Sequence, residues 1–266
     1  MSVVLITGCS SGFGLAAAVA LAKRGDTVIA TMRDVSKADS LKQAMGDHSF
    51  TLMELDITSP DSRRQAVAAT REKHGRVDIL INNAGIFSMG PMEVLGEENL
   101  RRQFETNVFG TFALTNLVIP QMRERGSGRI VNVTSAGAFL ARQYMAGYAA
   151  TKHAMDAITI GLDLELKPFN IRVCSVAPVQ YGTSIADNTA MPSADGPYGD
   201  QPVDHYKERR EIASGRSDLS PVTDAIADAA TNPNPKQRYL VAPGTLPIMD
   251  IFDAKVQFDE ERWKQT

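Results

Sequence analysis

A tyrosine and a lysine four residues apart are the first pair in the sequence that could perform acid–base chemistry. Tyr148 and Lys152 lie at the start of a stretch with helical apolar spacing, residues 149–166, so both side chains are expected on one helix face. A free tyrosine, with a pKa of about 10, is a poor acid or base at neutral pH. A neighbouring ammonium group favours the phenolate and lowers that pKa. The spacing therefore predicts an acid–base pair, and a Tyr–Lys pair on a solvated helix face is the alternative.

Two other polar residues could serve the same reaction. Ser135 follows the apolar run 129–134 and precedes Tyr148 by the length of a loop, which can bring its hydroxyl back beside the helix. That hydroxyl could hold a substrate oxygen, or the residue could be an ordinary N-cap or turn serine. Asn107 is expected in the middle of a helix, where asparagine is a mediocre helix former. It therefore indicates a polar role such as water binding, with a tolerated polar position as the alternative.

A glycine-rich turn comes between the first apolar run, residues 3–7, and a helical stretch that starts near Leu15. Its glycines, Gly8, Gly12 and Gly14, have the spacing G-x-x-x-G-x-G. Such a turn lets backbone approach a pyrophosphate closely, and the following helix N-terminus favours its charge. A dinucleotide site is predicted, and a generic strand–helix turn is the alternative. The residues expected to line the site are Gly8, Ser10, Ser11, Gly12, Phe13 and Gly14.

The end of the second apolar run, residues 27–31, indicates which dinucleotide is bound. NAD sites usually have an acidic residue here that holds the ribose 2′-hydroxyl. This chain has Met32, which cannot hydrogen-bond a ribose, followed by Arg33. An arginine can pair with a 2′-phosphate, so NADP(H) is predicted over NAD(H). The alternative is a solvated Arg33, with Asp34 doing the work of the usual acid one residue later.

Residues after the third and fourth apolar runs are further candidates for the cofactor site. Asp56 and Ile57 follow the third run, where a carboxylate could accept a hydrogen bond from an adenine amino group. An N-cap for the next helix is the alternative role of Asp56. After the fourth run, Asn83 could join neighbouring strand ends, and the small Ala84 and Gly85 would let a cofactor lie close. An ordinary Asn-Ala-Gly turn would explain this last piece equally well.

Large apolar side chains flank the predicted reaction centre. Phe87, Met89, Phe139, Tyr144 and Met145 follow the fourth and fifth apolar runs. They could belong to the core, but ligands of parallel sheets bind beyond the carboxyl ends of the strands. The sequence therefore predicts a largely apolar substrate pocket.

The elements that would position these residues alternate along the chain. Short, almost wholly apolar runs are separated by stretches of helical spacing such as 15–23, 61–73 and 149–166. Apolar strands are typical of a parallel sheet covered on both faces. The prediction is an α/β doubly wound (Rossmann) sheet of about seven strands with helices on both faces, as one domain over 1–266. The expected strands are 3–7, 27–31, 51–55, 77–81, 129–134, 172–176 and 238–241.

Composition excludes several classes of protein. The 266 residues carry 28 basic and 31 acidic side chains, a net charge of −3, which argues against nucleic-acid binding. Two cysteines, Cys9 and Cys174, rule out a disulfide framework. With no apolar run long enough to span a bilayer and no basic leader, a cytoplasmic protein without a membrane span is expected. The histidines lack metal-ligand spacing, so no metal is expected; His48, His74, His153 and His205 are predicted at the surface.

Regular patterning fades beyond Pro178. The segment 184–220 has scattered Gly, Pro, Asp and Ser and only patchy apolar spacing. Long loops in compact domains are usually functional. We expect this segment to be a lid or substrate-binding region within the same domain.

Together these motifs resemble those of the short-chain dehydrogenase/reductase family, over nearly all of the chain to about Pro178 and more loosely beyond. The motifs T-G-C-S-S-G-F-G at 7–14 and A-T-M-R-D at 30–34 are most similar to those of the hydroxysteroid and retinol dehydrogenase-like branch, whose members often prefer NADP. The resemblance rests on T-G-x-x-x-G-x-G at 7–14, Asp56, N-N-A-G at 82–85, Asn107, Ser135, Y-x-x-x-K at 148–152 and P-x-x-x-x-T at 178–183.

The resemblance implies roles for these residues. Tyr148 would be the general acid/base, and Lys152 would lower its pKa and bind the nicotinamide ribose. Ser135 would polarise the substrate oxygen, and Asn107 would hold a water in a proton relay to Lys152. Hydride would pass between the cofactor and the substrate carbon. Asp56 would hold adenine, and Pro178 and Thr183 the carboxamide end.

The chain also departs from the family pattern. Val179 stands where members usually have glycine, and a β-branched residue does not easily adopt a positive φ. The loop entering the substrate region, where Val179 and Gln180 are expected to contact substrate, is therefore predicted to differ. A common Asp-Gly-Gly ending is missing too. The family suggests a homodimer or homotetramer.

The favoured function is reversible conversion of a secondary alcohol to a ketone or aldehyde with NADP(H), on a medium or bulky apolar molecule of the steroid, retinoid or aryl-ketone kind. One alternative is a non-catalytic NADP-binding regulator, which loss of Tyr148 or Lys152 would have favoured. Another is a nucleotide-sugar epimerase or dehydratase on the same fold, which usually needs a longer substrate domain.

Overall fold

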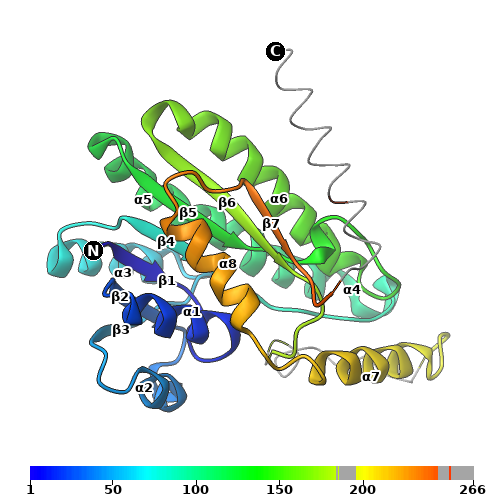
Figure 1. The fold of residues 1–266 in the computed structure, drawn as a ribbon. Coiled ribbons are helices and arrows are strands. Elements are labelled where there is room, and N and C mark those ends of the chain that lie inside the picture. Colours follow the sequence, from blue (N-terminus) through cyan, green and yellow to red (C-terminus); the bar gives the residue numbers. More distant parts are fainter. Residues whose placement is uncertain (184, 186–195, 245–251, 253–266) are drawn as a thin grey trace.

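The computed structural model describes residues 1–183, 185, 196–244 and 252 (Figure 1). The chain forms one parallel sheet in the order β3-β2-β1-β4-β5-β6-β7. All seven predicted strands are confirmed, with ends that differ by at most two residues. The strands are β1 (Val3–Ile6), β2 (Thr27–Met32), β3 (Phe50–Glu54), β4 (Ile79–Asn82), β5 (Gly128–Val133), β6 (Ile171–Pro178) and β7 (Arg238–Val241).

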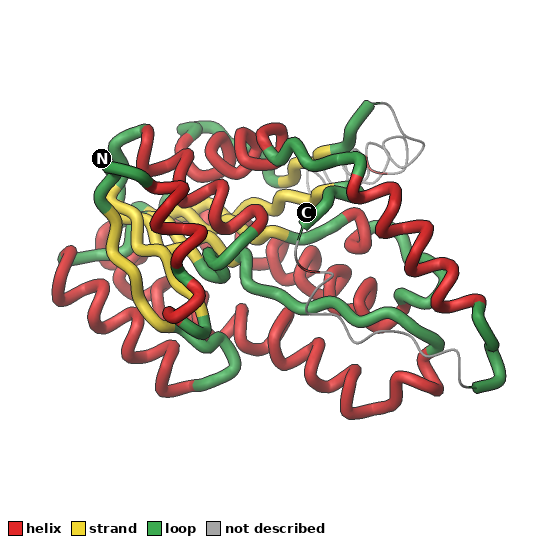
Figure 2. Tube along the Cα trace, turned by 90° about the horizontal axis from the view of Figure 1, so that it is seen from below, coloured by secondary structure: helices red, strands yellow, loops and turns green. Residues whose placement is uncertain are grey.

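Helices cover both faces of this sheet, as predicted (Figure 2). Helices α1 and α8 pack on one face, and α3, α5 and α6 on the other. The doubly wound architecture is therefore confirmed. The helices are α1 (Gly12–Lys23), α2 (Asp39–Met45), α3 (Pro60–His74), α4 (Met92–Phe104), α5 (Thr111–Arg125), α6 (Ala146–Leu166), α7 (Gln201–Ser214) and α8 (Ser220–Thr231). None of the helices in the described ranges is long and apolar enough to cross a membrane.

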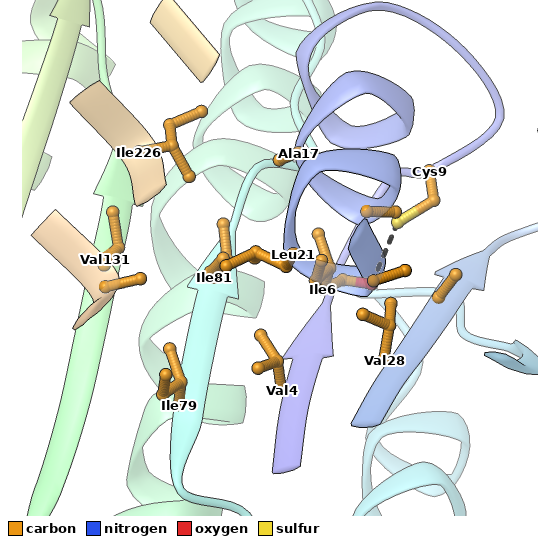
Figure 3. Close-up of a cluster of buried hydrophobic side chains, with 14 of the residues drawn as sticks. Val4, Ile6, Cys9, Ala17, Leu21, Val28, Ile79, Ile81, Val131 and Ile226 are labelled. Carbon is orange, nitrogen blue, oxygen red and sulfur yellow. Dashed lines mark hydrogen bonds between the residues drawn. The ribbon is translucent and has the colours of Figure 1, made fainter. Parts of the chain in front are cut away.

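Side chains of alternate residues on the central strands belong to two separate hydrophobic cores. On β1, Val4 and Ile6 belong to the core that also contains Leu21 of α1 and Ile226 of α8 (Figure 3). Their neighbours on the strand belong to the opposite core, with side chains of α3 and α5. Because both sides of β1 and β4 are buried, every position of such a central strand favours an apolar residue. This is why the strands were visible in the sequence.

Local signals fix several helix ends. Ser59 precedes α3, and its hydroxyl accepts a hydrogen bond from the N–H of Ser62 at 3.3 Å. Gly75 ends α3 with a φ of +79°, and Gly25 follows α1 with a φ of +88°. Glycine adopts these left-handed conformations without steric cost.

Helix α7 occupies much of the segment 184–220, which was predicted as a loop or lid (Figure 1). Only Pro202 and Tyr206 of this helix are buried, so its sequence shows almost no apolar periodicity. That is why the helix was missed. Residues 184 and 186–195 of the predicted segment lie outside the described residues.

The strand order reverses between β1 and β4. These two strands are neighbours, yet β1 leads outward to β2 and β3, and β4 leads outward to β5, β6 and β7. Ligands of doubly wound sheets bind beyond the carboxyl ends of the strands at such a point. The segments that leave β1 and β4 carry Gly8 and Asn83, and Ser135 follows β5.

Candidate active site

Ser135 and Tyr148 meet beyond the end of β5. Ser135 is in an extended conformation, and its hydroxyl accepts a hydrogen bond from the N–H of Gly137 at 3.1 Å. It is thus the N-cap of a short 3-10 helix, Ala136–Ala138. The same hydroxyl hydrogen-bonds to the side chain of Tyr148, whose exposed fraction is only 7%. The loop between them therefore does return the serine to the helix face, and Ser135 caps the 3-10 helix while its hydroxyl contacts Tyr148.

The protonation of Tyr148 and Lys152 is governed by burial. Burial raises the pKa of Tyr148 to about 12, although the Ser135 hydrogen bond and the Arg209 charge act in the opposite direction. Burial also lowers the pKa of Lys152 to about 8. The lysine Nζ lies 5.6 Å from the centre of the tyrosine ring and donates a hydrogen bond to the Val133 carbonyl at 3.3 Å.

The expected lowering of the Tyr148 pKa by Lys152 is therefore not found. The two side chains do share one face of α6, as the spacing predicted. However, desolvation disfavours the phenolate and the ammonium alike. Burial is the largest cause of the pKa shift of both groups. The arrangement favours a neutral tyrosine that can donate its proton.

Asn107 lies in a π-helical turn, Glu105–Gly110, between α4 and α5 rather than in a regular helix. Its Oδ1 accepts from the N–H of Ile86 at 2.8 Å, and its Nδ2 donates to the Ile86 carbonyl at 2.9 Å. Nδ2 also donates to the Thr151 hydroxyl at 3.1 Å. π-Bulges often occur at functional sites. Asn107 thereby fastens the segment after β4 to α6, one residue before Lys152.

The three turn glycines form a cradle that side chains would fill. A Cβ on Gly14 would lie 2.3 Å from the Gly8 carbonyl oxygen and 2.4 Å from Nδ2 of Asn83. Gly8 has a φ of +74°, and its Cβ would lie 2.9 Å from the Cα of Ala84. Helix α1 begins at Gly12 without a side-chain cap, so its first N–H groups point beyond the helix end. This is the arrangement that a pyrophosphate requires.

Asn83 joins the ends of β1 and β4, as one of its predicted roles required. Its Nδ2 donates to the carbonyl oxygens of Thr7 and Gly8, both at 3.0 Å. In return, the Thr7 hydroxyl accepts from the N–H groups of Asn83 and Ala84, at 3.0 and 2.9 Å. Gly85 follows, where a Cβ would lie 3.3 Å from Oδ1 of Asn107. The turn therefore connects the cradle to Asn107, one of the candidate site residues.

Arg33 is exposed directly after β2, at the position where a dinucleotide ribose is expected. Asp34 is the other candidate there, and its Oδ1 accepts from the N–H and the hydroxyl of Ser36, at 3.0 and 2.6 Å. These bonds hold the pKa of Asp34 below its usual range. Met32 is buried. Arg33 is therefore the more available of the two charged side chains.

Asp56 and Ile57 play different parts after β3. Oδ1 of Asp56 accepts from the N–H and the hydroxyl of Thr58, at 2.8 and 2.7 Å, while Ser59 caps α3. The alternative role of Asp56 as the N-cap of that helix is thus not found. Ile57 is buried in the core, and its carbonyl accepts a hydrogen bond from Arg63. Its side chain belongs to the packing of the sheet.

The turn after β6 accommodates Val179 without strain. Val179 is fully buried, and its N–H donates to the Val241 carbonyl at 2.9 Å. The positive φ expected of the usual glycine falls instead on Gln180, at +55°, whose Oε1 accepts from Arg216 at 3.2 Å. Further on, a Cβ on Gly12 would lie 3.4 Å from the Thr183 Cβ. The late motif and the glycine turn thus meet.

An apolar cluster surrounds the Tyr148 ring. Phe87 packs edge-on against it with ring centres 4.9 Å apart, and Met145 belongs to the same cluster. Tyr144 packs at its border and donates its hydroxyl hydrogen bond to Gln201 of α7 at 3.1 Å. Met89 is fully buried in the same cluster, so four of the five predicted flanking residues are brought together.

Phe139 is the exception among these flanking residues. It is not part of the cluster at Tyr148 and packs edge-on against Phe252, with ring centres 5.1 Å apart. The guanidinium of Arg238 lies 5.8 Å from its ring centre. Phe139 thus contacts the β7 side of the molecule.

Sequence reasoning missed the side chains that α7 brings to the site. Tyr206 is 4% exposed and joins the cluster of Phe87, Met145 and Tyr148. Arg209 shifts the pKa of Tyr148 by its charge. Both lie in the stretch Y-K-E-R-R-E, which reads as a solvated charged face. Tyr206, the one aromatic residue in this charged stretch, was the signal that one side of it is buried.

Cysteine and histidine residues do not form a reactive centre. Cys9 donates a hydrogen bond to the Ile6 carbonyl at 3.4 Å, and burial raises its pKa to about 12, as expected of a packing residue (Figure 3). His48 and His153 are exposed as predicted, but His74 and His205 are half-buried, which corrects the expectation of four surface histidines. Within the described ranges, no group of His, Cys, Asp and Glu could hold a metal ion.

Comparison with known proteins agrees with this geometry. The family described as short chain dehydrogenase matches residues 2–192. The chain belongs to this family of oxidoreductases, whose members use NAD(P)H. Among curated proteins, it is 37% identical to 3-ketodihydrosphingosine reductase of Bacteroides thetaiotaomicron, over 70% of this chain and 66% of that protein.

Two human relatives support the predicted branch. The chain is 38% identical to retinol dehydrogenase 8, over 66% of this chain and 57% of that protein. It is 32% identical to 17-beta-hydroxysteroid dehydrogenase type 1, over 93% of this chain and 80% of that protein. The chain thus spans less than two thirds of the length of the reductase and of the retinol dehydrogenase.

Solved structures show the same fold. A short-chain dehydrogenase from Streptomyces avermitilis superimposes with a TM-score of 0.81 at 33% identity, over 99% of this chain and 95% of that one. A 3-ketoacyl-(acyl-carrier-protein) reductase from Brucella melitensis, complexed with NADH, gives a TM-score of 0.76 at 30% identity, over 91% and 96%.

Proposed function

We propose that this protein is an NADP(H)-dependent reductase and alcohol dehydrogenase that interconverts a ketone or aldehyde with the corresponding alcohol. The observation that carries the proposal is the hydrogen bond between Ser135 and Tyr148, with Lys152 one helical turn further. A phenol, a hydroxyl and an amine converge beside a glycine cradle at the point where the strand order reverses. Such a constellation suits proton transfer to an oxygen beside a dinucleotide.

In the proposed reduction, Tyr148 donates its phenolic proton to the substrate carbonyl oxygen. Ser135 holds that same oxygen and stabilises the charge that develops on it. Lys152 supplies positive charge near the phenolate that remains, which limits the cost of losing the proton. Asn107 positions Lys152 through Thr151 and helps to hold a water that returns the proton from solvent. In the alcohol oxidation, the same residues act in reverse.

The cofactor residues proposed from the sequence fit a nicotinamide dinucleotide. The cradle of Gly8, Gly12 and Gly14 leaves room for backbone to approach a pyrophosphate. When bound, the dinucleotide donates or accepts the hydride. Around it we assign Ser10, Ser11, Phe13, Asp56, Ile57, Asn83, Ala84, Gly85, Tyr148, Lys152, Pro178 and Thr183 as contacts, Ile57 through its backbone.

Arg33 supports the preference for NADP(H) over NAD(H). Its side chain is exposed where the ribose 2′-phosphate would lie, and Asp34 is occupied by Ser36. A guanidinium can form two parallel hydrogen bonds with a phosphate. The related reductase is complexed with NADH, so the family fold also takes the other dinucleotide. In this chain we therefore assign to Arg33 the discrimination between NADPH and NADH.

The substrate is proposed to be medium or bulky and largely apolar at the reacting end. Phe87, Met145, Tyr144 and Tyr206 build an apolar wall around Tyr148. We further propose cytoplasmic function, which two unpaired, buried cysteines fit. A homo-oligomer is supported by Phe109 and Phe112, exposed large side chains next to and on α5.

A panel of carbonyl compounds tests this proposal. The purified protein is mixed with NADPH or NADH and each compound, and the loss of NADPH absorbance is recorded. We expect turnover of aryl or bulky alkyl ketones, with a higher kcat/KM for NADPH. Binding of NADPH without turnover of any compound would support a regulator instead. Turnover of sugars or small charged acids alone would contradict the apolar pocket.

A further inference from the structure

Arg209 of α7 has a guanidinium that the described protein leaves unpaired. Its side chain is half-buried, and its Nη1 is buried without a hydrogen-bond partner. No carboxylate in the described part of the chain forms an ion pair with it. Arginine is rarely buried unless an acceptor compensates for lost hydration. Within the residues that the structure describes, an acceptor is therefore missing at Nη1 of Arg209.

Arg209 lies on the face of α7 that covers the reaction centre. It follows Tyr206 by three residues, so the two side chains share a face of the helix. Tyr206 packs with Phe87, Met145 and Tyr148 in the apolar cluster. The Arg209 charge is close enough to lower the pKa of Tyr148. The guanidinium is thus placed beside the apolar cluster that is proposed to hold the substrate.

A second unpaired nitrogen accompanies it. His205 lies four residues before Arg209 on α7, and its Nε2 is buried without a hydrogen-bond partner. The imidazole ring packs edge-on against Tyr144, with ring centres 5.8 Å apart. Two buried nitrogen atoms without a hydrogen-bond partner therefore occur on one helix face, next to residues that border the site.

The charges around Arg209 reinforce its demand for an anion. Arg142 is near enough to lower the pKa of Arg209, as burial also does. Glu208 is the carboxylate that acts on it in the opposite direction, and that residue is exposed. The pyrophosphate cradle is formed by other segments, so the dinucleotide phosphates do not explain these donors.

We propose that the substrate carries an anionic oxygen group, a carboxylate or a phosphate ester, which Arg209 and His205 bind while the apolar cluster holds the carbon skeleton and its carbonyl. This inference rests on the proposed reductase function. It narrows the substrate class to amphipathic oxo acids or their phosphate counterparts. The anion would fix which carbonyl carbon is presented to Tyr148.

A matched pair of ketones tests this proposal. The probes are 4-benzoylbutyrate and its methyl ester, which share the aryl ketone and differ in charge. With NADPH, the wild-type kcat/KM for the acid is expected to exceed that for the ester by roughly 10- to 100-fold, the effect of a charge-assisted hydrogen bond. In Arg209→Gln this ratio should fall to about 1, and Arg209→Lys should restore part of it.

The control is Lys207→Gln, which removes one positive charge from the exposed side of the same helix. The ratio of its kcat/KM for the acid to its kcat/KM for the ester should equal that of the wild type. Octanoate and octyl phosphate, tested as inhibitors of ester reduction, distinguish the two anionic groups, and octanol is the neutral comparison. Preference for the ester, or an unchanged ratio in Arg209→Gln, would overturn the inference. If neither ketone reacts in the wild type, the reductase function itself fails.

Discussion

The side chain of Asn107 and the backbone of Ile86 exchange two hydrogen bonds, one in each direction, at 2.8 and 2.9 Å. A third bond links Asn107 to the Thr151 hydroxyl on α6. A single buried amide thus fixes the segment after β4 relative to the residue that precedes Lys152. The π-helical turn places this amide where a regular helix would have pointed it elsewhere.

Replacing this amide should destabilise the protein. Asn107→Ala removes three hydrogen bonds and leaves the Ile86 groups without partners, which should lower the free energy of unfolding by about 2–4 kcal/mol. Urea denaturation measures the loss. Asn234→Ala, at an exposed position, is the control and should change stability by less than about 0.5 kcal/mol. Equal stabilities for the two variants would show that Asn107 does not fasten these segments.

A methyl group on Gly14 should close the cradle. Its Cβ would lie 2.3 Å from the Gly8 carbonyl oxygen, which is backbone and cannot move aside cheaply. We expect Gly14→Ala to weaken NADPH binding at least tenfold, measured by fluorescence titration. Gly161→Ala is the matched control, because nothing lies within 4 Å of its Cβ on α6. The control should bind NADPH normally and gain up to about 1 kcal/mol of stability from helix propensity. Unchanged binding in Gly14→Ala would place the dinucleotide elsewhere.

Lys152 should make stability rise with pH. Burial lowers its pKa to about 8 from the ordinary 10.5. Between these values the unfolded chain binds more protons than the folded one, so the free energy of unfolding increases with pH. The gain from pH 8 to 10.5 should be on the order of 3 kcal/mol. Urea denaturation of the wild type and Lys152→Met at several pH values measures it. The difference in the free energy of unfolding between the two proteins should change between pH 8 and 10.5. A constant difference would contradict the lowered pKa of Lys152.

Arg33 should determine the choice of dinucleotide. In Arg33→Ala, kcat/KM with NADPH should fall by roughly 10- to 100-fold, because a charge-assisted pair with the 2′-phosphate is lost. The value with NADH should change little. Arg24→Ala, beyond the opposite end of α1, is a control that removes the same charge. An NADPH preference that survives in Arg33→Ala would refute this assignment.

The sheet could be predicted from the sequence because its strands are buried on both faces. Runs such as Val3–Ile6 are uniformly apolar, and residues like Ser59 and Gly75 mark helix ends by local chemistry. The cofactor and catalytic motifs were visible for a related reason, since their spacing is short and fixed by single turns. The contact between Ser135 and Tyr148 could be predicted too, because it requires only that the loop between them returns to α6.

Features that depend on contacts distant in sequence could not be predicted. The position of Arg209 near Tyr148 follows from where α7 packs, and α7 itself has only two buried residues. The pKa of Tyr148 depends on the depth of burial, which outweighs the neighbouring amine that the spacing revealed. Phe139 had the right place along the chain, yet its ring packs against Phe252 and Arg238.

The central claim is that Tyr148 transfers the proton, and Tyr148→Phe tests it most directly. The variant removes one oxygen and keeps the ring that packs against Phe87. Turnover of the best ketone with NADPH should fall by about 100- to 10,000-fold, the contribution of a general acid, while NADPH affinity by fluorescence titration stays within about threefold. Residual turnover within tenfold of the wild type, with NADPH still bound, would show that the proton comes from another group.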